Sequence, residues 1–179
     1  MHDTRERLES ILNRRIAVLD GSWGVLLQRE VRGEEGYRGE WFRDHSHDVA
    51  GDPDLLNLTQ PELISRIHND YFAAGADIAT TNTFTATTIG QADYYLEADV
   101  VDQMNREGAR LARAAAAEWT AKTPGRPRFV AGSVGPLNVS LSLSPRVDDP
   151  AYRSATFDEV LEAYAHQIDR KSTRLNSSH

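Results

Sequence analysis

The pattern of apolar and polar positions along the chain predicts alternating strands and helices. The continuous apolar run over 16–19 is typical of a strand buried on both faces of a parallel sheet, and short runs that contain apolar residues predict two further strands over 77–81 and 128–131. Helical spacing of apolar residues fills the intervals between these runs. Strands that alternate with helices form parallel βαβ units, and right-handed crossovers then put the carboxyl ends of all strands on one side. An open doubly wound sheet and part of a (β/α)₈ barrel both fit this order.

The helices are predicted from their apolar stripes and their start signals. Capping boxes at Thr59–Glu62 and Thr156–Glu159 each predict the first turn of a helix. An alanine-rich segment over 100–120 and a short amphipathic segment over 5–14 are also expected to be helical. The polar, glycine-rich stretch from Glu30 to Pro53 is expected to be a long surface excursion.

Composition and charge narrow the class of protein. The chain has 179 residues, 40% of them hydrophobic, and a formal net charge of −7, which fits one folded domain. The sequence has no dense basic patch of the kind that binds nucleic acid. No apolar run is long enough to cross a bilayer, and no hydrophobic region follows the N-terminus as it would in a secretory signal. A cytoplasmic protein without a membrane partner is therefore expected. The absence of cysteine excludes a disulfide, a thiolate zinc site and a cysteine nucleophile.

Polar side chains follow each of the three apolar runs and are the candidate binding residues. Asp20 could bind a substrate ammonium group, and Gly21 could let a backbone N–H approach the ligand, although a simple tight turn is the preferred interpretation of this pair taken alone. Asn82 and Thr83 end the second run, and Ser133 follows the third, where each could contact a ligand or satisfy nearby backbone groups. The sequence predicts no catalytic residue.

Three other segments give weaker evidence for a function. His45 and His47 are flanked by aspartates and could bind a metal, but solvated loop histidines are the preferred interpretation, so no metal site is predicted. The Gly132–Pro136 loop is neither GxGxxG nor a phosphate-loop pattern, which argues against a nucleotide site. Residues 171–179 (KSTRLNSSH) have no apolar face, so we predict a domain over 1–170 followed by a non-native or disordered tail.

Several longer motifs point to a known family. The chain resembles the homocysteine-binding domain of cobalamin-dependent methionine synthase from about Arg15 to Ile168. The motifs that carry the resemblance are VLDGSWG (18–24), DLLNLTQP (54–61), GADIATTNTF (75–84), FVAGSVGP (129–136) and LSLSP (141–145).

The resemblance implies a fold and an activity. It implies a (β/α)₈ TIM barrel, of which this chain would form about the first three βα units. It also implies methyl transfer from cobalamin to the thiol of homocysteine, activated by a zinc ion on three cysteines, with cobalamin and folate modules as partners in the parent enzyme. Asp20 and Gly21 would touch the amino-acid end of homocysteine, with Asn82, Thr83 and Ser133 at the pocket floor.

This sequence departs from the family pattern in ways that affect function. It has no cysteine, so the zinc ligands are missing and the chain is expected to be an inactive fragment of the methyltransferase. Thr80 stands where the family often has glutamate, and Trp23 and Val25 stand where methionine and threonine are common. Two alternatives remain: a non-catalytic α/β module that binds an amino acid or an anion, and a chain whose unpaired strand edges prevent stable folding.

Overall fold

The computed structural model describes residues 2–176, and it is a helix-rich α/β structure with a small parallel sheet. The sheet consists of β1 (Ile78–Thr80) and β2 (Phe129–Ala131), paired in parallel with Ala79 opposite Val130. Leu19 makes a single parallel bridge to Ile78 on the other side of β1. Three chain segments therefore run in the same direction, in the order in which they occur in the sequence. The predicted parallel arrangement is confirmed.

The segment predicted as the first strand is less regular and less buried than expected. Only the bridge at Leu19 remains of it. Ile16 is 85% exposed, and Val18 and Leu19 are about half exposed. The expectation of burial on both faces is wrong, because β1 pairs with one edge of this segment and no other described element covers these side chains.

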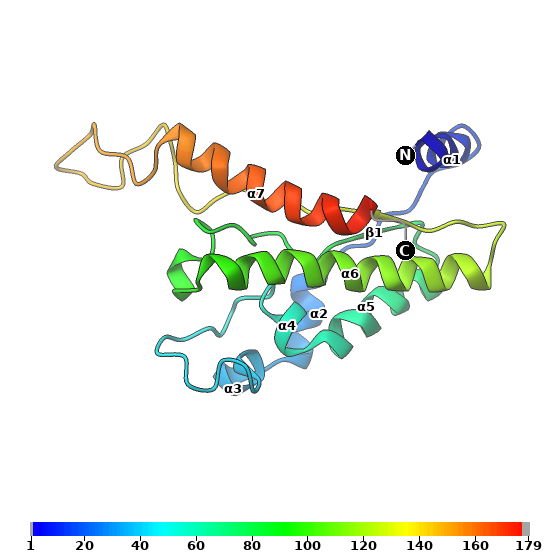
Figure 1. Ribbon diagram of the computed structural model, residues 1–179, viewed down its shortest axis with the longest axis horizontal. Coiled ribbons are helices and arrows are strands. Elements are labelled where there is room, and N and C mark those ends of the chain that lie inside the picture. The colour runs from blue at the N-terminus through cyan, green and yellow to red at the C-terminus, as the bar shows by residue number, and fades with distance from the viewer. Residues whose placement is uncertain (1, 177–179) are drawn as a thin grey trace.

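Helices make up most of the structure. Their bounds are α1 (His2–Leu12), α2 (Trp23–Glu30), α3 (Gly33–Arg38), α4 (Leu56–Thr59), α5 (Pro61–Ala74), the 3₁₀ helix η1 (Ala92–Tyr94), α6 (Ala98–Lys122) and α7 (Phe157–Asn176). The long helix α6 lies in the middle, with α7 along one side and α4 and α5 along the other (Figure 1). None of the helices in the described part of the chain is both long enough and apolar enough to cross a membrane.

The hydrophobic core lies mainly between α6 and the helices that precede it in the chain. A larger cluster joins α2, α4, α5 and α6. A smaller one packs Phe72 and alanines of α6 against β1. The 30–53 stretch belongs to the larger cluster, since it contains α3 and buries four apolar side chains: Val31, Tyr37, Phe42 and Val49. The expectation of a plain surface excursion is therefore wrong, because these spaced apolar residues cover the core.

The two predicted capping boxes have different outcomes. At α7, the Glu159 carboxylate accepts hydrogen bonds from the backbone N–H and the hydroxyl of Thr156, and the Glu159 N–H donates to the Thr156 hydroxyl at 3.2 Å. This capping box is confirmed. At α5, Thr59 belongs to α4, and Gln60 occupies the N-cap without a side-chain cap bond. The prediction fails there because a preceding helical turn already uses the threonine.

Helix α7 leaves two of its large apolar side chains about half exposed. Leu161 and Ile168 are 55% and 50% exposed. The buried side chains are instead Ala163, Gln167 and Lys171. Residues 171–176 continue the helix, whereas 177–179 lie outside the described residues. The non-native origin of 171–179 stays a prediction.

Candidate functional site

The polar ends of the three parallel segments are joined to one another by hydrogen bonds. Thr80, at the end of β1, donates to the Asp20 carboxylate from its backbone N–H (2.9 Å) and from its hydroxyl (2.8 Å). On the other side, the N–H of Ser133 donates to the hydroxyl oxygen of Thr81 at 2.9 Å. The carboxyl ends of the three segments therefore form one continuous polar edge, where ligands bind in parallel α/β proteins.

Asp20 is the carboxylate of this edge. It is 9% exposed, and its N–H donates to the carbonyl of Ile78, which fixes its place beside β1. Its Oδ2 accepts the N–H of Thr80 and the indole N–H of Trp23, whereas Oδ1 accepts the hydroxyl of Thr80. A carboxylate oxygen can accept two hydrogen bonds, so Oδ1 keeps capacity for one more donor.

Gly21 adjoins Asp20 at an exposed position. A Cβ built on Gly21 would meet no atom within 4 Å. The residue in the left-handed region of this turn is Ser22, with φ 57°. A side chain at position 21 would therefore be accommodated, and any need for glycine there would come from a bound ligand.

Asn82 uses its side-chain donor within the protein. Its Nδ2 donates to the carbonyl of Pro53 at 2.7 Å, and its own carbonyl accepts the side chain of Asn57 at 2.6 Å. Both contacts tie the end of β1 to the segment before α4. Asn82 is 5% exposed, so its clearest role is to position the edge.

Thr83 and Ser133 lie together on the far side of the edge. The hydroxyls of Thr81 and Thr83 are 2.7 Å apart, and the Thr83 hydroxyl also donates to the carbonyl of Ser133 at 3.3 Å. Thr83 is fully buried, whereas Ser133 is partly exposed. Of the two, Ser133 is the residue that a ligand could reach.

Helix α7 closes over this side of the edge. Gln167 donates to the carbonyl of Thr83 at 2.9 Å, and the ammonium group of Lys171 donates to the carbonyl of Ser133. Burial lowers the pKa of Lys171 to about 8. Because Lys171 belongs to the segment predicted to be non-native, we assign it no function.

Sequence reasoning missed three residues that build the edge. Thr80 and Thr81 hold the neighbouring segments, and Trp23 holds Asp20. The threonines could have been found from their position, because they occupy the last strand residue and the one after it. Trp23 gave no local signal, since its partner lies three residues earlier in a turn that only the fold defines.

Two further acids lie buried behind the edge. Asp52 and Asp54 are both 0% exposed. Burial raises the pKa of Asp52 to about 7, and the nearby charge of Asp54 adds to this shift. Burial also raises the pKa of Asp54 to about 6, although Thr85 donates to it from its backbone N–H at 2.6 Å. These acids hold the loop that follows β1 and are not open to a ligand.

The histidines of the 30–53 stretch are engaged within the protein. His45 Nε2 lies 2.9 Å from the carbonyl of Tyr94, and the His47 ring stacks on Tyr95 at 3.7 Å between centroids. Within residues 2–176, no group of three or more histidine, cysteine or acidic side chains could hold a metal ion.

The fold is that of a parallel α/β protein with polar side chains gathered at its strand ends. Sequence comparison identifies the family. A profile of homocysteine S-methyltransferase matches residues 17–177. The chain belongs to the homocysteine S-methyltransferase family.

Solved structures agree with this fold. The metallated form of the homocysteine methyltransferase MmuM from Escherichia coli has a TM-score of 0.66 and 22% identity, and the match covers 95% of this chain and 54% of that one. The oxidized form has a TM-score of 0.66 and 23% identity, and the match covers 93% of this chain and 53% of that one. The apo form has a TM-score of 0.59 and 22% identity, and the match covers 93% of this chain and 49% of that one. The chain thus spans about half the length of these enzymes.

Proposed function

We propose that this chain forms the part of a homocysteine S-methyltransferase that holds the amino-acid end of homocysteine. The observation that carries the proposal is the Asp20 carboxylate, which lies at the shared edge of three parallel segments in a chain of this family. The substrate ammonium group donates to Asp20 Oδ1. The exposed backbone at Gly21 and the partly exposed Ser133 contact the rest of the amino acid, while Asn82 and Thr83 support them.

The proposed architecture is the first part of an eight-stranded barrel. The parallel order Leu19, Ile78, Phe129 follows the chain, as in a (β/α)₈ barrel. The chain also spans about half the length of the solved relatives. A cytoplasmic location, and cobalamin and folate modules elsewhere in the parent enzyme, belong to this proposal as expectations from the family resemblance.

The residues of this chain do not fit the zinc ion that the resemblance implies. That ion is held by three cysteine thiolates, and this sequence has no cysteine. The chain therefore provides binding and orientation of the amino-acid group, whereas activation of the thiol requires residues from elsewhere. We expect no methyl transfer by this chain alone.

Calorimetry with homocysteine tests the proposal. The chain should bind homocysteine with or without added zinc, and Asp20→Asn should weaken binding about tenfold or more, since a charged hydrogen bond contributes roughly 1.5–3 kcal/mol. Asp70→Asn, at an exposed position on α5, is the matched control and should leave the affinity unchanged. Equal affinities for wild type and Asp20→Asn would refute the binding role.

The absence of cysteine also keeps the second candidate function open, a binding module without catalysis. The two proposals differ in what happens when the missing residues are supplied. If the downstream half of a family member, added as a separate chain, restores methyl transfer, the methyltransferase proposal holds. If binding is tight but no complementation occurs, the chain acts as a binding module.

A further inference from the structure

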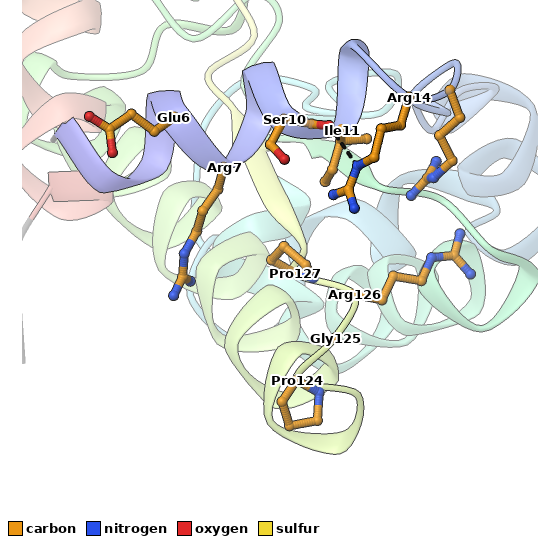
Figure 2. Close-up of a pocket in the computed structure, with 10 residues that line it drawn as sticks. Glu6, Arg7, Ser10, Ile11, Arg14, Pro124, Gly125, Arg126 and Pro127 are labelled. Carbon is orange, nitrogen blue, oxygen red and sulfur yellow. Dashed lines mark hydrogen bonds between the residues drawn. The ribbon is translucent and has the colours of Figure 1, made fainter.

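A concave site lies at the opposite end of the parallel segments from Asp20. It is a cleft of about 940 Å³ between α1 and the turn that leads into β2. Figure 2 shows α1 as one wall, carrying Arg7 and Arg14, and the 124–127 turn with Arg126 as the other. Arg15 and Arg126 both precede strand segments, so the cleft opens at the amino ends of these segments.

Arginine dominates the charge of this cleft. Four arginines line it, Arg7, Arg14, Arg15 and Arg126, whereas Glu6 is its one acidic lining residue. This concentration of positive charge contrasts with the net charge of −7 for the whole chain. Clefts lined by one sign of charge concentrate ligands of the opposite sign.

Two of the guanidinium groups are fixed in position by one buried acid. Arg15 binds both oxygens of Asp77, at 2.6 and 2.8 Å, and Arg126 binds Asp77 Oδ1 at 3.3 Å. Asp77 is 0% exposed, whereas the side chains of Arg15 and Arg126 are each 42% exposed. One carboxylate thus holds two cations that remain accessible from the cleft, which leaves an excess positive charge in a rigid arrangement.

Arg14 adds to that excess from α1. Its Nε donates to the carbonyl of Ser10 at 2.9 Å, and no acceptor among residues 2–176 binds its terminal nitrogens. Those nitrogens are therefore free to bind an anion in the cleft.

We propose that this cleft binds a small organic phosphate. Guanidinium groups bind phosphate oxygens in pairs, and those held in place beforehand lose less conformational freedom on binding. The volume is within the range of ligand sites and exceeds that of a phosphate group alone. Ile11, Pro124 and Pro127 supply an apolar wall for the remainder of the ligand. This site is separate from the proposed homocysteine site, and neither depends on the other.

Titration of the full chain with inorganic pyrophosphate, followed by calorimetry, tests the proposal. Wild type should bind one pyrophosphate at low salt, with an affinity that falls as salt is added. Arg14→Gln should weaken binding about tenfold, and Glu6→Gln should strengthen it about twofold by removing the opposing charge. Arg66→Gln is the control, because Arg66 is an exposed arginine that pairs with Glu30 away from the cleft.

The outcomes are distinct. An equal loss of pyrophosphate affinity in Arg14→Gln and Arg66→Gln would mean a general charge effect and would overturn the proposal. Sulfate binding as strongly as pyrophosphate would mean an adventitious ion only, and an absence of saturable binding at low salt would overturn the proposal as well. Unfolding midpoints without ligand should agree between wild type and Arg14→Gln, which excludes misfolding as the cause of any loss.

Discussion

The indole N–H of Trp23 donates to Asp20 Oδ2 at 3.1 Å, and the Trp23 ring meets the fully buried ring of His68 edge-on at 4.7 Å. Trp23 thus connects the carboxylate at the strand ends to the core beneath α5. An apolar side chain without a ring N–H could not donate such a hydrogen bond.

Trp23→Phe should loosen Asp20 while keeping an aromatic ring against His68. We expect the free energy of unfolding to fall by about 1 kcal/mol, the usual net value of one hydrogen bond, and homocysteine to bind about fivefold more weakly. An analogue that lacks the amino group should bind wild type and variant equally, because it does not use Asp20. A similar loss for both ligands would show that Trp23 acts on the pocket generally.

Gly108→Ala should disturb the packing behind Thr83. A Cβ at position 108 would lie 2.6 Å from Thr83 Cγ2 and 2.9 Å from Asn57 Nδ2, so neighbouring side chains must move. We expect a loss of about 1–3 kcal/mol in the free energy of unfolding, measured by urea denaturation. Gly125→Ala is the control, since no atom lies within 4 Å of a Cβ there. Equal effects of the two substitutions would contradict close packing at Gly108.

The buried acids Asp52 and Asp54 should make stability depend on pH. Burial raises their pKa values to about 7 and about 6 from the ordinary aspartate value of 3.8, so the folded state holds protons more tightly than the unfolded chain. Their contribution to stability is therefore complete below about pH 4 and is lost as the pH rises to about 7.

Asp52→Asn removes one of these titrating groups. The decline in the free energy of unfolding between about pH 4 and pH 8 should become smaller than in wild type, by on the order of 1–3 kcal/mol. Denaturant unfolding at several pH values measures this difference, with Asp70→Asn as an exposed control. Parallel curves for wild type and Asp52→Asn would contradict the burial of an acid with a raised pKa.

Thr156→Ala should weaken the start of α7. The substitution removes the hydroxyl that accepts from the Glu159 N–H and donates to its carboxylate, which should cost about 1 kcal/mol. Thr156→Ser keeps the hydroxyl and serves as the matched control. Thermal unfolding measures both, and an unchanged midpoint in Thr156→Ala would show that α7 contributes little to the cooperative unit.

Local sequence patterns were sufficient to predict the elements with strong helix and strand signals. The alanine-rich segment over 100–120 is helical as predicted, and so is the first turn of α7, where the capping box at Thr156 forms. Parallel strands followed from their alternation with helices. These features depend on residues close together in the chain, so local patterns are sufficient to predict them.

Which apolar runs are buried, and which polar groups form hydrogen bonds, depends on how distant segments pack in three dimensions. Ile16 is exposed despite lying in an apolar run, because burial depends on what packs against it. Asp20 accepts hydrogen bonds from Thr80 and Trp23. The contact with Thr80 depends on the pairing of segments about 60 residues apart, and the contact with Trp23 depends on the geometry of one turn. The two arginines on Asp77 likewise lie far from it in the sequence, Arg15 62 residues before it and Arg126 49 residues after it, and no local pattern specifies such a contact.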